Sequence, residues 1–319
     1  MNKTAVILLN LGGPDSLEAI EPFLYNLFCD PDIFKLPFGQ KFLAKLISSR
    51  RASKVAEEYK LIGGKSPINE WTEIQRSMLE NLLRQENENI DVHIAMRYWK
   101  PLTEETVAKI ESGNYDKIIL LPLYPHYSIT TIGSSFNEWN RHYKGDKSKL
   151  VYIGNYETNE KYIAALNQRI DETLLRFPVE IWKDVQLVFS AHGTPVSLVK
   201  KGDPYSKQIK ETVEAVMNAR LHSHPHHLCF QSKVGPMKWL EPSTASMIEE
   251  LASKNKKNLL IVPISFVSDH VETLFELDIE YRHVADKCGI ENYIVMKGLN
   301  DSELFVEALA ELVKRELQP

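Results

Sequence analysis

The stretches Ala5–Pro14 (AVILLNLGGP) and Val185–Pro195 (VQLVFSAHGTP) decide the fold class, and they share one design. Each begins with a run of apolar side chains and passes through a glycine-containing turn to a proline. Such continuous apolar runs are typical of strands in a parallel sheet that is covered on both faces. A second pair, Lys117–Ser128 (KIILLPLYPHYS) and Asn258–His270 (NLLIVPISFVSDH), carries a proline in each run. The repetition predicts two similar halves.

Short apolar runs alternate with longer amphipathic segments along the whole chain, which predicts right-handed βαβ units. The expected strands are Ala5–Leu9, Val92–Met96, Ile118–Leu123, Val151–Ile153, Val185–Ala191, Leu228–Phe230, Leu259–Ile264 and Tyr293–Met296. The fold class is therefore α/β, with two Rossmann-like halves, each a doubly wound parallel sheet flanked by helices, and a cleft between them. The predicted domains are 1–156 and 157–319, and a last helix over 302–317 can pack back on the first half.

Composition excludes several classes of protein. A hydrophobic content of 43% over 319 residues excludes intrinsic disorder, and a net charge of −5 argues against nucleic-acid binding. The three cysteines, Cys29, Cys229 and Cys288, are too few and too scattered for a disulfide framework or a four-cysteine iron–sulfur cluster. Without a signal peptide or an apolar run of ~18 residues, we expect a cytoplasmic protein that can still lie against a membrane.

No phosphate-binding glycine motif of the GxGxxG or GxxxxGK[ST] type occurs, so nucleotide binding is disfavoured despite the Rossmann-like layout. Ligands of open α/β sheets bind beyond the carboxyl ends of the strands. His192 follows such a strand end, and Gly193 lets the backbone turn sharply after it. We expect burial to lower the pKa of His192, which suits a neutral base or a metal ligand. The alternative is a histidine that only hydrogen-bonds the turn.

Four carboxylates, Asp269, Glu272, Glu276 and Glu280, recur at spacings of three, four and four. On a helix these steps bring them to one face, where a row of oxygen ligands can pass a cation or a proton. The alternative is that Asp269 and Glu272 cap the helix while the others face solvent.

Other segments are open to two interpretations. Arg97 follows a strand and, with Arg50 and Arg51, can grip a ligand carboxylate, although the latter two also suit a solvated helix face. The apolar side chains between Phe28 and Leu46 suit either core or a lip over a flat ligand or bilayer. The four histidines within His222–His227 define no metal geometry, and their role stays open.

Taken together, these motifs resemble the ferrochelatases, which insert Fe²⁺ into a porphyrin. The resemblance covers nearly the whole chain, in order. It rests on LLNLGGP (8–14), EEYKLIGGKSPI (57–68), AMRYWKPLTEE (95–105), PHYSITTIGSS (125–135), FSAHGTP (189–195) with GDPY (202–205), FQSKVGPMKWLEPST (230–244) and PISFVSDHVETLFELDIEY (263–281). The QSKVGPM segment is more similar to the protoporphyrin branch than to the coproporphyrin branch.

The resemblance implies roles for individual residues. His192 and Glu272 would be catalytic and, with Asp269, Glu276 and Glu280, would handle the metal. The residues expected to contact porphyrin are Leu11, Arg50, Arg51, Tyr59, Ser66, Arg97, Tyr98, Trp239 and His270. The chain departs from many relatives at Gly193–Thr194, where they have Ser-Leu, and it ends without the cysteine-rich extension that binds [2Fe–2S] in some of them.

The expected reaction is insertion of Fe²⁺ into protoporphyrin IX, with iron as a substrate and no tightly bound cofactor. The alternatives are coproporphyrin III as the substrate, another metal and tetrapyrrole, or a non-enzymatic porphyrin carrier. The resemblance leaves the chain either a monomer or a homodimer.

Overall fold

The computed structural model describes residues 3–34, 39–233, 235 and 237–318. It divides the chain into two compact units, one of Met1–Asn155 with Phe305–Pro319 and one of Tyr156–Leu304. The C-terminal segment thus belongs with the first unit, where the Lys117 ammonium donates to the Glu316 carbonyl and Lys314 pairs with Glu86. Each unit is described by itself.

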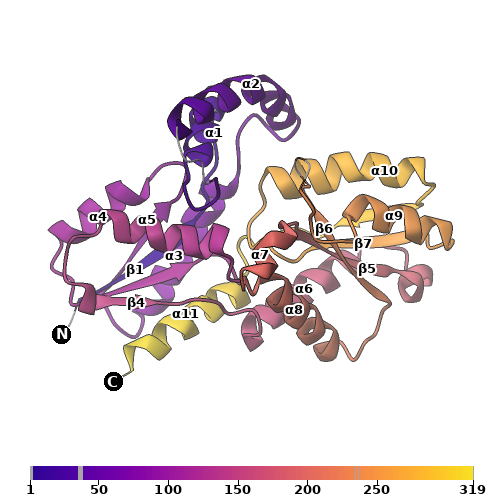
Figure 1. Ribbon diagram of the computed structural model, residues 1–319. Coiled ribbons are helices and arrows are strands. Elements are labelled where there is room, and N and C mark those ends of the chain that lie inside the picture. The colour runs from indigo at the N-terminus through magenta and orange to yellow at the C-terminus, as the bar shows by residue number, and fades with distance from the viewer. Residues whose placement is uncertain (1–2, 35–38, 234, 236, 319) are drawn as a thin grey trace. The chain divides into compact units, whose positions relative to one another are not determined.

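The first unit is built on a four-stranded parallel sheet (Figure 1). Its strand order is β2-β1-β3-β4, with β1 at Thr4–Asn10, β2 at Ile90–Met96, β3 at Lys117–Pro122 and β4 at Leu150–Tyr152. Its helices are α1 (Ile20–Phe28), α2 (Gln40–Leu61), α3 (Ile68–Arg84), α4 (Thr103–Ser112), α5 (Ser134–His142) and α11 (Glu303–Leu317), with a π-helical turn at Ile129–Gly133 and a 3-10 turn at Lys147–Lys149.

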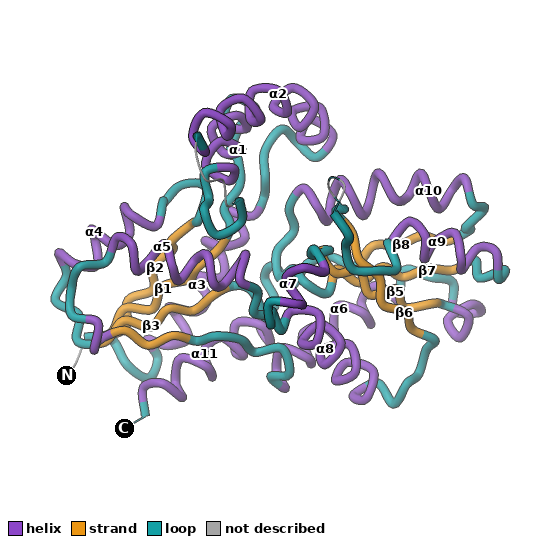
Figure 2. The backbone as a smooth tube through the Cα atoms, in the orientation of Figure 1, coloured by secondary structure: helices purple, strands orange, loops and turns teal. Residues whose placement is uncertain are grey.

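The second unit has the same topology, with strand order β6-β5-β7-β8 and all pairs parallel (Figure 2). Its strands are β5 (Gln186–His192), β6 (His226–Gln231), β7 (Asn258–Pro263) and β8 (Asn292–Val295). Its helices are α6 (Glu160–Leu174), α7 (Val196–Lys200), α8 (Tyr205–Ala219), α9 (Thr244–Ser253) and α10 (Tyr281–Lys287), with a 3-10 turn at Val179–Asp184 and a π-helix at Glu272–Glu280.

The central strands are buried along nearly their whole length because helices cover both faces of each sheet. Every residue of β1 and of β7 is buried. In the first unit α4 and α5 pack on the face that carries Ala5, Ile7 and Leu9. In the second unit α9 and α10 cover the corresponding face, and α6 and α8 lie on the other side (Figure 1). The prediction of two similar doubly wound α/β halves is confirmed.

The two sheets also agree in register. Leu9 pairs with Pro122 in the first unit, and Ser190 pairs with Pro263 in the second. Two residues further along, Leu11 and His192 therefore hold equivalent positions, each just past the main run of a central strand. The second unit carries an imidazole where the first carries an aliphatic side chain, so the chemistry of this position belongs to the second unit.

Candidate active site

His192 is the last residue of β5, a central strand of the second sheet. Its backbone is held from two sides, because its N–H donates to Ser265 Oγ and its carbonyl accepts from the Tyr205 hydroxyl, both at 2.9 Å. The imidazole is 37% exposed. A rigid strand end thus presents a partly exposed ring, as a general base requires.

Glu272 opens the π-helix and meets this ring. Its Oε1 lies 3.5 Å from Nδ1 of His192, which is within ion-pair range but long for a hydrogen bond. Among the described residues, His192 Nδ1 has no hydrogen-bond partner. The structure therefore brings together the two residues that the resemblance made catalytic.

The two groups shift each other's titration. Burial alone would lower the pKa of His192, but the attraction of Glu272 outweighs it and raises that pKa above its ordinary value. Burial alone would raise the pKa of Glu272, yet the charge of His192 and the contact with His270 hold it far below its ordinary value. The expectation of a lowered pKa for His192 was wrong in its net direction, because it left out the carboxylate partner.

His270 extends the pair to three groups. Its Nδ1 lies 3.0 Å from the Ser268 carbonyl, and its Nε2 lies 3.0 Å from Oε2 of Glu272. A carbonyl can only accept, so Nδ1 donates to Ser268, while Nε2 faces the Glu272 carboxylate. His192, Glu272 and His270 thus form one connected cluster of titratable side chains. His270 itself is buried, at 4% exposure.

Gly193 and Trp239 form the wall beside His192. A Cβ on Gly193 would lie 2.6 Å from the Gln231 carbonyl oxygen and 3.4 Å from the Trp239 ring. Gly193 is thus required for a close approach to β6 rather than for a sharp turn, which corrects the sequence-based reason. Trp239 is half-buried, and its backbone pairs with that of Pro195 in an isolated antiparallel β-bridge. Its indole therefore lies next to the turn that follows His192.

Asp269 does not join the carboxylate row on the helix. It precedes the π-helix and is buried, and its oxygens accept from Thr273 Oγ1, the Gly298 N–H and Asn300 Nδ2 at 2.7–3.1 Å. It does not cap the helix either, because the N-cap position is Val271 and no backbone N–H of the described helix donates to Asp269. Glu272, the other residue expected to cap the helix, is turned to the histidines instead.

Glu276 is also committed to protein donors. It accepts from the Ser232 N–H and hydroxyl, from Gln231 Nε2 and from the Tyr281 hydroxyl. Burial and the charge of Glu272 raise its pKa. Glu280 is exposed at the far end of the helix. Within the described part of the chain, no three His, Cys, Asp or Glu side chains are arranged to hold a metal ion.

Arg97 and Tyr98 lie in the first unit and are buried rather than open to a ligand. The Arg97 guanidinium contacts Ser134 Oγ at 2.8 Å and Asp30 Oδ1 at 3.0 Å. The Tyr98 hydroxyl donates to Asp30 Oδ2, and its ring is 2% exposed. The structure does not support the prediction that these side chains contact porphyrin, because an internal carboxylate already satisfies both.

The other predicted ligand contacts of the first unit fall into two groups. Tyr59 and Ser66 are buried, and Ser66 packs against Gly13 with its N–H on the Pro14 carbonyl. Leu11 is half-buried, whereas Arg50 and Arg51 are exposed on α2, where Arg51 lies over the Phe28 ring. Only these last three side chains are open enough to reach a ligand as they stand.

The apolar segment between Phe28 and Leu46 divides between core and surface. Phe28 is buried, but Phe42 is 76% exposed and Leu46 is 36% exposed on α2. Leu36 and Phe38 lie outside the described residues. Contact with a membrane surface stays a prediction that these exposed side chains favour. No helix in the described ranges is long and apolar enough to cross a bilayer.

The histidine segment lies away from His192. His222 sits in a turn after α8, while His226 and His227 already belong to β6, so the expectation of a loop up to residue 227 was wrong at its end. The His222 and His226 rings are 6.0 Å apart, and His222 Nε2 contacts Asn218 Oδ1.

Sequence reasoning missed the residues that support the site. Tyr205 and Ser265 hold His192, Gln231 and Ser232 hold Glu276, and Asn300 holds Asp269. Tyr205 lies in the GDPY motif and Ser265 in the PISF motif, so the motifs that support the resemblance already contained both residues. Asp30 and Asn300 had no local signal, because their partners come from distant segments.

Comparison with known proteins supplies the family. The ferrochelatase family model matches residues 3–317. The chain belongs to the ferrochelatase family. It is 49% identical to ferrochelatase of Citrifermentans bemidjiense over 98% of both chains. It is 44% identical to that of Picosynechococcus over the whole of this chain and 84% of the relative.

Solved structures agree on the fold alone. SirB from Bacillus subtilis with Fe³⁺ superposes with a TM-score of 0.54 at 13% identity, covering 98% of this chain and 95% of that one. A multi-domain chelatase-like protein of Deinococcus radiodurans gives a TM-score of 0.51 at 11% identity over 99% of this chain and 55% of that one.

Membership of the ferrochelatase family makes this chain a lyase, a metal chelatase of haem biosynthesis that takes porphyrin and ferrous iron as substrates.

Proposed function

We propose that this chain inserts Fe²⁺ into protoporphyrin IX, giving protohaem and two protons. The observation that carries the proposal is the contact of His192 with Glu272 at the strand ends of the second sheet, with His270 on the other oxygen of Glu272. Metallation needs a base that takes protons from pyrrole nitrogens and a route that removes them. This cluster has the residue types for both.

The proton steps follow from the geometry. With Nδ1 of neutral His192 protonated toward Glu272, its Nε2 is the free lone pair and accepts a pyrrole proton. The resulting imidazolium is stabilised by the Glu272 carboxylate at 3.5 Å. Release of that proton to solvent, to which the imidazole is 37% exposed, restores the neutral base for the second transfer. Two such transfers leave the dianionic macrocycle to bind Fe²⁺, so charge and atoms balance.

Trp239 supplies a flat surface beside the base. Its indole is half-buried and adjoins Gly193, so a ring stacked on it would lie within reach of His192. A rigid wall that binds the macrocycle bent favours the transition state over the flat product. Glu276 contributes by anchoring Ser232 rather than by binding iron, since protein donors already occupy its oxygens.

Protoporphyrin IX is proposed over coproporphyrin III because Gln231–Met237 (QSKVGPM) resembles the protoporphyrin branch. Anaerobic incubation of the enzyme with Fe²⁺ and either porphyrin, followed by absorbance, tests this choice. We expect a higher kcat/KM for protoporphyrin IX. A preference for coproporphyrin III would overturn the substrate assignment but not the base.

Metal choice needs its own experiment, because first-row affinity alone does not select iron. Co²⁺ or Ni²⁺ in competition with Fe²⁺ on the same porphyrin separates a ferrochelatase from another tetrapyrrole chelatase. A single-turnover metallation assay separates an enzyme from a carrier, since a carrier binds the porphyrin without releasing protons.

A further inference from the structure

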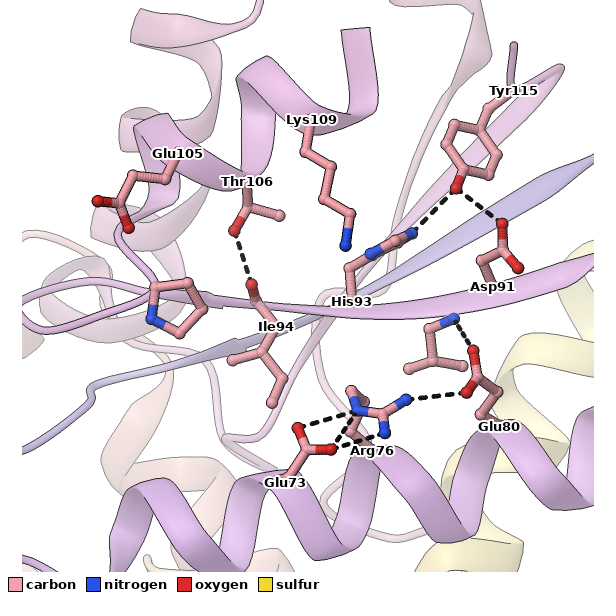
Figure 3. Close-up of a pocket in the computed structure, with 12 residues that line it drawn as sticks. Glu73, Arg76, Glu80, Asp91, His93, Ile94, Glu105, Thr106, Lys109 and Tyr115 are labelled. Atoms are coloured by element: carbon pink, nitrogen blue, oxygen red, sulfur yellow. Dashed lines mark hydrogen bonds and ion pairs between the residues drawn. The ribbon is translucent and has the colours of Figure 1, made fainter. Parts of the chain in front are cut away.

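A groove runs along the outer edge of the first sheet, where β2 is the edge strand. It has a volume of about 700 Å³. Its floor is the middle of β2 between Asp91 and Ile94, and α3 and α4 form its two sides, with Tyr115 at one end (Figure 3). An edge strand presents backbone groups that have no partner strand, so each one must be accounted for.

Most of the outward groups of β2 are covered by the protein itself. In β2 the backbone N–H and carbonyl groups of odd-numbered residues face β1, because the Thr4 N–H donates to the Asn89 carbonyl and the Arg97 N–H donates to the Asn10 carbonyl. The backbone N–H and carbonyl groups of even-numbered residues therefore point away from β1. The covered groups are the Ile90 carbonyl (Arg84), the Val92 N–H (Glu80), the Ile94 carbonyl (Thr106), the Met96 N–H (Pro101) and the Met96 carbonyl (Thr103).

Two groups in the middle of the groove are left over. Among the described residues, the Val92 carbonyl and the Ile94 N–H have no hydrogen-bond partner. They form one acceptor and one donor on the same edge, spaced as an added strand requires. Covered groups on both sides limit that pairing to a short segment and prevent open-ended sheet growth.

The carboxylates of the groove are all engaged. Glu73 and Glu80 bind Arg76, Asp91 binds Lys3 and Arg84, and the Glu105 carboxylate accepts from the Leu102 N–H. The Arg76 guanidinium is already paired with Glu73 and Glu80. The groove therefore has no unpaired anion among its lining residues.

One cation in the groove is unpaired. The Lys109 ammonium makes no ion pair within the described residues, and it points toward His93 (Figure 3). His93 is uncharged near neutrality, because burial and the charge of Lys109 lower its pKa. His93 Nε2 contacts the Tyr115 hydroxyl, which donates to Asp91, so Nε2 carries the proton and Nδ1 is left as an acceptor.

From these contacts we infer that the groove is a docking site for a short extended peptide segment that carries an acidic side chain. The segment donates one N–H to the Val92 carbonyl and accepts from the Ile94 N–H, as in strand addition to a sheet edge. Its carboxylate pairs with Lys109. At a rise of about 3.3 Å per residue, a segment of about three residues spans the uncovered stretch of β2 from Val92 to Ile94. The inference is independent of the metallation chemistry, which resides in the second unit.

The probe is the peptide Ac-Val-Glu-Val-NH₂, titrated into the ¹⁵N-labelled full chain and followed by amide shifts. We expect the Ile94 amide and residues 106–109 to shift together. Ac-Val-Lys-Val-NH₂ should bind about threefold to fivefold more weakly, as the loss of one exposed ion pair predicts. A version of the glutamate peptide with esters in place of its amides should bind more weakly, because an ester cannot donate to the Val92 carbonyl.

The matched variants are Lys109→Glu and Lys256→Glu, both at exposed lysines. Lys109→Glu should reverse the preference in favour of the lysine peptide, whereas Lys256→Glu should leave it unchanged. Unchanged metallation by both variants shows that they are folded. Absence of a shift at Ile94 with millimolar peptide, or equal binding of the two peptides by the unaltered chain, would overturn the inference.

Discussion

The Nδ1 atom of His192 lies 3.5 Å from the Oε1 atom of Glu272, although one ends a strand and the other opens a π-helix. A strand end and the first residue of the helix after the neighbouring strand meet because both lie at the carboxyl edge of a parallel sheet. The contact raises the pKa of His192 against the effect of burial, so the ring is a stronger base than an ordinary histidine.

Replacing His192 with alanine should remove the base and leave the porphyrin surface intact. We expect kcat for metallation to fall by about 10² to 10⁴-fold, the usual contribution of a positioned base. Porphyrin affinity, followed by fluorescence quenching, should change little. His222→Ala, at an exposed histidine away from the site, is the control and should retain full activity. Turnover of His192→Ala at the normal rate would remove this residue from the mechanism.

Replacing Glu272 with glutamine should move the pH profile. His192 must be neutral to accept a proton, so kcat/KM of the unaltered chain should rise with pH through a midpoint above 6.5, the ordinary pKa of histidine. Without the carboxylate, burial dominates, and we expect the midpoint to move to lower pH. A profile that keeps its midpoint would show that Glu272 does not set the charge of His192.

The same pair has opposite effects on stability at the two ends of the pH range. The contribution of His192, whose pKa is raised, is present below its unfolded pKa and is lost as pH rises through its folded pKa. The contribution of Glu272, whose pKa is lowered, is present above its unfolded pKa and is lost as pH falls through its folded pKa. The difference in unfolding free energy between the unaltered chain and Glu272→Gln should therefore be largest between those limits.

Replacing Gly193 with alanine should strain the turn that carries the base. The new Cβ would lie 2.6 Å from a backbone oxygen of Gln231, which cannot move without shifting β6. We expect a loss of about 1–3 kcal/mol in unfolding free energy, measured in urea, with a fall in kcat. Gly154→Ala is the matched control, since its Cβ would meet nothing within 4 Å. Equal behaviour of the two variants would contradict the close-approach argument.

Replacing Asp30 with alanine should destabilise the first unit more than any surface change. The Asp30 carboxylate is fully buried, and its loss leaves the Arg97 guanidinium buried without its main partner. We expect a cost of about 3–5 kcal/mol, measured from urea unfolding. Asp32→Ala, which removes a more exposed pair with Arg141, should cost less than about 1 kcal/mol. A small effect at Asp30 would mean that Arg97 finds another acceptor.

The predicted strands were confirmed because continuous apolar runs report burial on both faces, which depends on local sequence. The prolines in β3 and β7 did not mislead, since Pro122 and Pro263 are the last residues of their strands. The π-helix was not predicted, because the spacing of four carboxylates fits either helix type. Asp269 was placed on that helix for the same reason, although it precedes it.

The sequence by itself determined the two-sheet architecture and the family, since these depend on apolar patterning and on motifs read in order, whereas the direct contact of His192 with Glu272 came from the fold. Only the tertiary structure decided which motif residues are open to a ligand. Tyr98, Arg97, Asp269 and Glu276 have the chemistry of binding residues, yet each is satisfied by a donor or acceptor from a distant segment. Whether a polar side chain is free to bind a ligand depends on which groups the fold places beside it. The spacing of residues along the chain does not predict those neighbours.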